Sequence, residues 1–176
     1  VDPYSLRANL SLPKLLINGT NDRYWTLDAA NFYFDQLPGD KHLLYVPNAG
    51  HGLSDLTRVT GGLAAFFNET AAGKSLPGFQ AHSSLTGNIL TLSATSTGRP
   101  RSVVAWTASS ATADFRMSHW TSTPMTLANG DYSFKTTMPT TGHLAIFAEA
   151  GYTEGGVDYN LSSSPIILPT IEHKTK

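Results

Sequence analysis

Residues 73–80, GKSLPGFQ, divide the chain into two parts with different hydrophobic patterns. Before them, apolar runs of strand length alternate with segments of helical spacing. After them, only short runs rich in Val, Ile, Thr and aromatic residues follow. We therefore expect an α/β unit over 1–72, with 73–80 as a linker to an all-β domain over 81–170. Residues 171–176 form a tail.

Two continuous apolar runs in the first part have the pattern of strands buried on both faces of a parallel sheet. They are KLLINGT (14–20) and KHLLYVP (41–47), with LDAANFYFDQL (27–37) at helical spacing between them. An amphipathic helix is predicted over 54–72. Two parallel strands are too few for a stable doubly wound sheet. We therefore expect this part to be a fragment of a larger sheet, with the missing strands upstream of Val1.

The second part contains six strand-like runs, which are 81–87, 88–95, 101–109, 131–138, 143–152 and 164–169. Turn residues such as Asn129-Gly130 separate them. About seven short strands in a segment of this length are typical of a small antiparallel β-sandwich of the immunoglobulin or fibronectin type. The chain has no cysteine, so a true immunoglobulin disulfide is excluded.

The composition excludes several classes of function. The net charge is −1 and the 12 Lys and Arg are scattered, so we expect no nucleic-acid partner. No apolar stretch is long enough to span a membrane. The absence of cysteine excludes disulfides, zinc–thiolate sites and thiol catalysis. The low charge and the abundance of Ser and Thr suit a secreted or extracytoplasmic protein, periplasmic in a bacterium.

Four N-x-[ST] sequons give weak further support for secretion, since about two are expected by chance in a chain this rich in Ser and Thr. They begin at Asn9, Asn18, Asn68 and Asn160.

Asp22 and His51 are the candidate catalytic residues. In α/β-hydrolases the triad occurs in the order Ser, then Asp or Glu, then His, with the acid after a late strand and the histidine after the next. Asp22 follows the first apolar run, and His51 follows the second, just before the predicted helix. A carboxylate on Nδ1 fixes the imidazole tautomer and stabilises the imidazolium. Gly50 and Gly52 are expected to let the histidine loop turn sharply and expose the ring to a cleft.

Each of these residues also has a structural explanation. An Asp in a GTND turn hydrogen-bonds its own backbone, and a Gly-flanked His is often an ordinary surface residue. Asp28 is an alternative acid, although its position favours the start of the segment 27–37. Asp55 is expected to stabilise the amino terminus of the second helix, for which Ser54 is the predicted N-cap.

We expect no metal and no cofactor, because the other histidines lack the spacing of metal ligands. They are His42, His82, His119, His143 and His173. Four aromatic residues of the second part, in alternation, are expected to be core rather than a carbohydrate platform. They are Trp106, Trp120, Tyr132 and Phe147. Asp114 and Arg116 are expected to form an internal ion pair or to lie at a strand edge.

The chain resembles the PhoPQ-activated pathogenicity-related proteins (PqaA type) in VDPYSLRANLSLPKLLINGTNDRYW and LPGDKHLLYVPNAGHGL. ATADFRMSHWTSTPM and GDYSFKTTMP look like the same family's carboxy-terminal segment, so the resemblance extends from Val1 to about Pro169. It implies an extracytoplasmic or secreted α/β-hydrolase fold with an appended β domain. It also implies Asp22 as triad acid and His51 as triad base. The family's nucleophile serine matches no position here, since the sequence contains no G-x-S-x-G.

The sequence thus predicts the carboxy-terminal part of a secreted serine hydrolase acting on an ester or amide. The nucleophile would lie in an amino-terminal half outside these residues, so this chain alone is expected to be inactive. The alternative is a non-catalytic extracellular signalling or binding protein, resembling relatives that repress proliferation, on a hydrolase scaffold. In that case the β-sandwich would recognise the partner.

Overall fold

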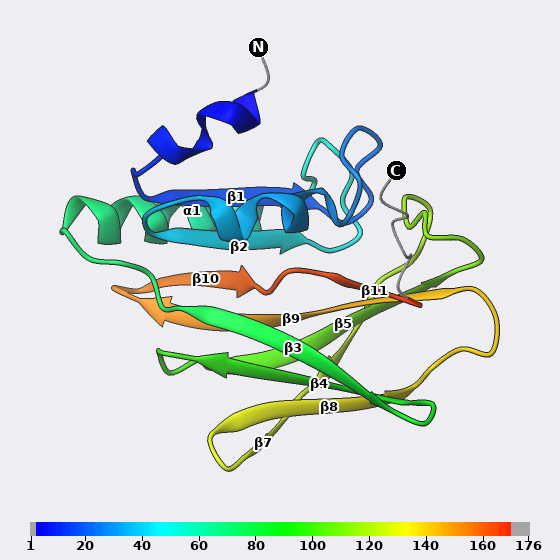
Figure 1. Cartoon of the computed structure of the whole chain (residues 1–176). Helices are drawn as coiled ribbons and strands as arrows, with labels where there is room; N and C mark the ends of the chain where they lie inside the picture. Colours follow the sequence, from blue (N-terminus) through cyan, green and yellow to red (C-terminus); the bar gives the residue numbers. More distant parts are fainter. Residues whose placement is uncertain (1–2, 170–176) are drawn as a thin grey trace.

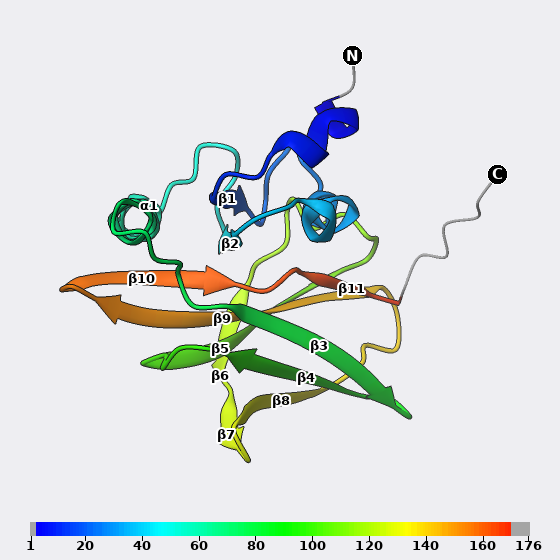
Figure 2. The ribbon, with the colours of Figure 1, turned by 60° about the vertical axis from the view of Figure 1, so that its left-hand side comes forward.

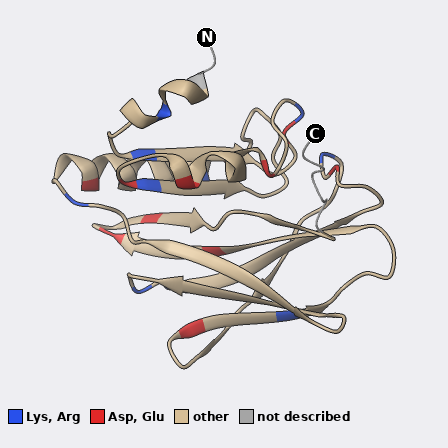
Figure 3. Ribbon diagram, viewed as in Figure 1, with Lys and Arg blue, Asp and Glu red and all other residues tan. Residues whose placement is uncertain are grey.

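The structure is a computed structural model that describes residues 3–169, so the predicted tail and His173 lie outside the described residues. It consists mostly of β-sheet with few helices (Figure 1). No helix among residues 3–169 has the length and apolarity needed to cross a membrane. Lys, Arg, Asp and Glu are dispersed over many elements (Figure 3).

The first part contains the two predicted parallel strands and one α-helix. Its elements in chain order are η1 (Pro3–Asn9), β1 (Lys14–Gly19), η2 (Ala29–Phe32), η3 (Phe34–Gln36), β2 (Lys41–Val46) and α1 (Leu56–Ala71). β1 and β2 pair in parallel, with a register from Lys14 opposite Lys41 to Gly19 opposite Val46. β2 is almost completely buried, whereas β1 is half-buried over most of its length. The two strands therefore end side by side at their carboxyl ends.

The prediction of a helix over 27–37 is wrong. The segment forms two short 3₁₀ helices, η2 and η3, interrupted at Tyr33, whose φ of −136° is not helical. Asp28, at the N-cap position of η2, makes no side-chain hydrogen bond to the first turn, so the segment lacks the cap that stabilises the start of a helix. Leu27, Ala30 and Leu37 are nevertheless buried, so the apolar positions were identified and the regular helix was not.

Helix α1 confirms the second predicted helix, but its N-cap is Asp55 rather than Ser54. The Asp55 carboxylate accepts a hydrogen bond from the backbone N–H of Arg58 at 3.0 Å. Two adjacent glycines then let the helix lie close to its neighbours. A Cβ on Gly61 would lie 2.3 Å from the Asp158 carbonyl oxygen, and a Cβ on Gly62 would lie 2.7 Å from a Leu44 methyl group.

The second part forms a β-sandwich of two antiparallel sheets. One sheet has the order β10–β9–β5–β6, with β11 also paired to β9, and the other has the order β3–β4–β8–β7. The strands are β3 (Phe79–Thr86), β4 (Ile89–Ser96), β5 (Ser102–Ser110), β6 (Thr121–Pro124), β7 (Thr126–Ala128), β8 (Asp131–Thr137), β9 (His143–Glu154), β10 (Val157–Ser162) and β11 (Ile166–Leu168). The sequence did not predict β6, β7 or β10, and β3 begins inside the segment predicted as a linker.

Strand β9 is buried on both faces because it lies between two cores. Leu144, Ile146 and Ala148 face the interior of the sandwich. Ala145 and Phe147 pack on the other side, in a cluster that includes Leu43 and Tyr45 of β2. Figure 2 shows β1, β2 and α1 stacked on the sheet that contains β9 and β10. The α/β unit is therefore a third layer on the sandwich, and the two parts share a buried interface.

Candidate active site

The loops that follow β1 and β2 meet because the strands are parallel and adjacent. Gly19 is required at this point, since a Cβ there would lie 2.4 Å from the Ala49 carbonyl oxygen and 2.6 Å from that of Gly50. The backbone N–H of Asn21 donates to the Ala49 carbonyl oxygen at 2.9 Å. The acid loop and the histidine loop are thus joined directly by backbone contacts.

The structure brings the two predicted site residues into contact. Asp22 Oδ2 lies 2.9 Å from His51 Nδ1. An ionised carboxylate can only accept a hydrogen bond, so the Nδ1 of His51 carries a proton, and in the neutral ring Nε2 has a free lone pair. This is the arrangement in which an acid orients a histidine that acts as a base.

Asp22 is itself held by its own loop. Its Oδ1 accepts hydrogen bonds from the backbone N–H groups of Tyr24 at 2.7 Å and Trp25 at 3.3 Å, and the residue is only 7% exposed. Burial acts to raise the pKa of the Asp22 carboxyl. The hydrogen bonds from Tyr24, His51 and Trp25 outweigh burial and hold this pKa below its usual value. The carboxyl is therefore ionised at neutral pH.

The His51 ring is open to solvent on the side away from Asp22. Its side chain is 59% exposed, and no described residue makes a hydrogen bond to Nε2. The ring of Tyr24 packs edge-on against it, with 4.9 Å between ring centroids. Nε2 is consequently accessible to a group approaching from outside these residues.

The sharp turns of the histidine loop do not occur at the predicted glycines. The residues with positive φ are Asn48, at 59°, and Leu53, at 45°, and Gly50 and Gly52 are not among them. Asn48 tolerates this conformation, whereas Leu53 adopts it at a cost in backbone strain. The backbone N–H of Leu53 donates to the Gly50 carbonyl oxygen at 3.0 Å, which closes the turn around His51.

The alternative acids do not contact His51. Asp28 precedes η2 and makes no side-chain cap hydrogen bond there. Asp55 caps α1 and also lies 3.3 Å from the Arg58 Nε. Of the three carboxylates considered from the sequence, Asp22 alone is hydrogen-bonded to the imidazole.

Two asparagines that the sequence did not single out connect the site to the sandwich. The Asn21 amide donates to carbonyl oxygens in the connection between β5 and β6, and Asn48 exchanges hydrogen bonds with Trp120 in the same connection. In the sequence these residues resemble ordinary turn asparagines. Their partners are backbone groups 72 to 97 residues away, so no local pattern marks them.

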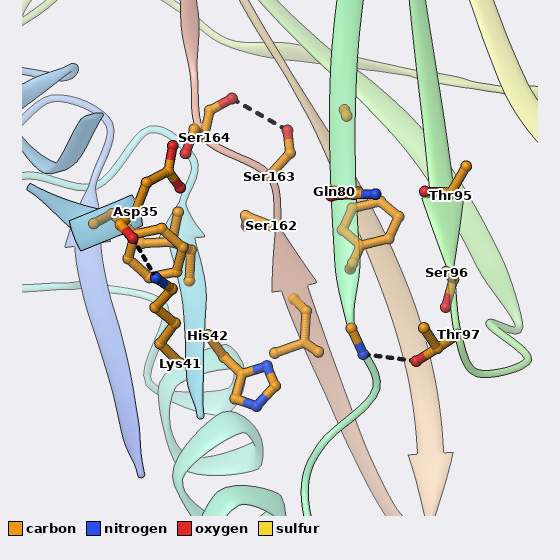
Figure 4. A pocket seen from close by; sticks show the side chains of 16 residues that line it. Asp35, Lys41, His42, Gln80, Thr95, Ser96, Thr97, Ser162, Ser163 and Ser164 are labelled. Carbon is orange, nitrogen blue, oxygen red and sulfur yellow. Dashed lines mark hydrogen bonds between the residues drawn. The ribbon is translucent and has the colours of Figure 1, made fainter. Parts of the chain in front are cut away.

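Two cavities lie at the surface of the α/β unit. A cleft of about 360 Å³ lies beside Asp22, between the loop 20–27 and residues 113–116. A larger one of about 600 Å³ lies between the α/β unit and the sandwich and is lined by hydroxyl and amide side chains such as Ser163, Gln80 and Thr95 (Figure 4). The larger cavity is lined by no residue of the acid or histidine loops. The cleft of about 360 Å³ is therefore the one beside the Asp22–His51 pair.

The other residues that the sequence analysis singled out take part in packing or in contacts within the second part. Trp120 and Phe147 are core residues, 1% and 0% exposed, as predicted. Trp106 donates a hydrogen bond to the Glu149 carboxylate at 3.3 Å, and Tyr132 packs at the edge of the sandwich core. The predicted pair of Asp114 and Arg116 is confirmed as an ion pair at 2.5 Å.

Comparison with known proteins identifies one family. The sequence model of the PhoPQ-activated pathogenicity-related protein family matches residues 1–116, which include both candidate site residues. No curated protein matches the chain. One solved structure, a carbohydrate-binding module family 56 β-1,3-glucan binding domain, is 11% identical with a TM-score of 0.35 and covers 51% of this chain and 96% of its own length. That similarity is too low to support any conclusion about fold or function.

Proposed function

The chain belongs to the PhoPQ-activated pathogenicity-related protein family, and we propose that it supplies the acid–base half of a serine hydrolase. The observation that carries the proposal is the 2.9 Å hydrogen bond between Asp22 and His51 Nδ1, with Nε2 exposed. A histidine in this state can accept a proton from a nucleophile that approaches Nε2. The substrate class is an ester or an amide.

The nucleophile in this proposal is a serine outside residues 1–176. Its Oγ attacks the acyl carbon while His51 Nε2 takes the hydroxyl proton, and the carbonyl π electrons move to the oxygen. His51 then gives the proton to the leaving alcohol or amine as the carbonyl re-forms. Water repeats the sequence on the acyl-enzyme and releases the acid. Asp22 keeps the imidazole in one tautomer and stabilises the imidazolium at each step.

The same proposal identifies β1, β2 and α1 as the carboxy-terminal part of an α/β-hydrolase sheet. It is supported by the parallel pairing, by the order of acid and histidine along the chain and by the free edge of β1 within the described residues. The residues of β1 are only half-buried, as expected for a strand whose second neighbour comes from another segment. In this proposal an amino-terminal segment outside residues 1–176 provides that strand.

We also propose that the protein is secreted or extracytoplasmic. The support is compositional: the chain has few charges, is rich in Ser and Thr and carries sequons. Asn9 and Asn68 are exposed, so two of the four sequons lie where a glycan would meet no steric barrier. Treatment of the protein from its native source with a glycosidase, followed by mass measurement, tests this directly in a eukaryotic source.

The experiment that tests the hydrolase proposal compares Asp22→Asn with Asp28→Asn in the longer protein that contains the serine. Asp22→Asn is expected to lower kcat for a simple ester by about 10⁴-fold, because an amide does not fix the required tautomer. Asp28→Asn is expected to leave kcat unchanged, because Asp28 has no hydrogen bond to His51.

Equal rates in the two variants would contradict the assignment of Asp22. A folded longer protein with no hydrolytic activity would instead favour the alternative function, in which the family scaffold binds or signals without catalysis.

A further inference from the structure

Asn21 joins the acid loop to the connection between β5 and β6, which comprises residues 111–120 and is called the 111–120 connection below. Its side-chain Nδ2 donates to the carbonyl oxygens of Ser118 at 2.7 Å, Arg116 at 3.1 Å and Phe115 at 3.3 Å. Its Oδ1 accepts from the Thr20 hydroxyl at 2.7 Å. All the polar atoms of this side chain are therefore used to hold the residue beside Asp22 against the sandwich.

Asn48 makes the corresponding connection from the histidine loop. Its Oδ1 accepts from the backbone N–H of Trp120 at 2.7 Å, and its Nδ2 donates to the Trp120 carbonyl oxygen at 3.0 Å. Its backbone N–H donates to the Thr20 hydroxyl at 2.9 Å, which ties the histidine loop to the acid loop. Asn48 lies three residues before His51, at the turn with positive φ.

The 111–120 connection is itself anchored in the interior. The rings of Phe115 and Trp120 are 2% and 1% exposed and pack with Phe147 of β9. The Asp114–Arg116 ion pair and the bond from the Ser110 hydroxyl to the Asp114 carbonyl oxygen, at 2.7 Å, stiffen its exposed half. Carbonyl groups presented by such a segment have fixed positions, so they can locate the side chains that bond to them.

We propose that the 111–120 connection is a clamp that sets the geometry of the Asp22–His51 pair, with Asn21 and Asn48 as positioning residues. In this role the sandwich is a structural part of the site and is not only an appended module. The inference rests on the proposed function for its catalytic meaning, whereas the geometry that it predicts is a property of this chain alone. Neither asparagine touches the reacting atoms, and each acts through the residue or loop next to it.

The test measures the tautomer of His51 by ¹⁵N NMR in the 176-residue chain, at a pH where the ring is neutral. Wild-type His51 is expected to be almost entirely the Nδ1–H form, because Asp22 holds that proton. Asn21→Ala and Asn48→Gly are each expected to reduce the Nδ1–H form to a minority. Loss of the signal in His51→Gln assigns the resonance.

Two matched controls distinguish a specific effect on the position of His51 from a general loss of stability. Asn31→Ala also removes an asparagine hydrogen bond to the second part, at 2.8 Å to the Pro165 carbonyl oxygen, but Asn31 belongs to η2 and not to the acid or histidine loop. Asn129→Gly makes the same substitution as Asn48→Gly at another residue with positive φ, 54°, in the β7–β8 turn. Both are expected to keep the wild-type tautomer.

Asn48→Gly is the deciding variant if Asn21→Ala does not fold, because glycine accepts the positive φ without strain. A wild-type tautomer in folded Asn48→Gly, with faster amide exchange in the 111–120 connection, would overturn the proposal. Failure of the hydrolase function is detected separately, as inactivity of the longer protein. If the longer protein is inactive but the tautomer still shifts in Asn21→Ala and Asn48→Gly, the clamp is supported and the hydrolase function is rejected.

Discussion

The α/β unit and the β-sandwich contribute to the candidate site in different ways. The α/β unit provides the two candidate catalytic side chains, Asp22 and His51, on two short loops at the ends of parallel strands. The sandwich provides backbone carbonyl groups and buried aromatic anchors, and among its described residues no side chain forms a hydrogen bond to Asp22 or His51. Under the proposed clamp, a layer that carries neither candidate catalytic residue sets the geometry of the site, because it holds the loops that carry them.

The largest expected effect tests whether the two parts are one cooperative unit. Phe147 of β9 is fully buried and packs with Tyr45 of β2 and with Trp120. Phe147→Ala is expected to cost about 3–5 kcal/mol of unfolding free energy through lost burial and a cavity. Urea denaturation should show one transition by both tryptophan fluorescence and circular dichroism. Two separated transitions would instead mean that the α/β unit and the sandwich are independent domains.

The next effect concerns the charged contact across the same interface. The Glu149 carboxylate on β9 is 4% exposed and pairs with Arg58 at the start of α1. Glu149→Ala is expected to cost about 3 kcal/mol, because it leaves a mostly buried guanidinium without this partner. Glu154→Ala, at the exposed end of the same strand, should change stability by at most about 0.5 kcal/mol. Equal effects of the two variants would exclude a structural role for the contact.

A smaller effect tests how closely α1 lies on the sandwich. Gly61→Ala places a Cβ against the Asp158 carbonyl oxygen and is expected to cost about 1–3 kcal/mol, despite the better helix propensity of alanine. Gly62→Ala meets the end of the Leu44 side chain at 2.7 Å and no backbone atom, so its cost should be smaller, about 1 kcal/mol. A reversed order in thermal melting would show that α1 does not pack on β10 in this way.

The smallest effect is a pH dependence confined to the α/β unit. The folded pKa of Asp22 lies below its unfolded value, so its ionisation stabilises the fold above the usual carboxyl pKa of about 3.9. This contribution is lost as the pH falls through the lower, folded pKa. Wild-type protein should therefore lose more stability than Asp22→Asn between about pH 5 and pH 2. If the unfolding free energies of the two proteins fall equally over this pH range, Asp22 is not a hydrogen-bonded carboxylate with a lowered pKa.

Much of the fold could be predicted from the sequence, because short segments carry the patterns of their own strands, helix and turns. β1 and β2 are continuous apolar runs and α1 has an amphipathic period, and strands of the sandwich end at turns such as Asn129-Gly130, where both residues have positive φ. β10 was missed although Gly155-Gly156, with φ of 56° and 81°, marks the hairpin that leads into it. β6 could not be found from its pattern, because all four of its residues are exposed and show no alternation.

The candidate site was only partly predictable. The proximity of Asp22 and His51 follows from two buried parallel strands in succession, each with a polar residue after it. The roles of Asn21 and Asn48 depend on where the carbonyl groups of residues 115–120 come to lie. Every residue has a carbonyl group, so only the packing of the three layers decides which ones become partners.

The most direct measurement of the central claim is labelling with a fluorophosphonate serine probe. It compares the longer protein, its His51→Ala variant and the 176-residue chain. We expect that the longer protein with the proposed serine reacts, that folded His51→Ala reacts at least about 10³-fold more slowly, and that the 176-residue chain does not react. Equally fast labelling of folded His51→Ala, or no labelling of the folded longer protein, would contradict the central claim.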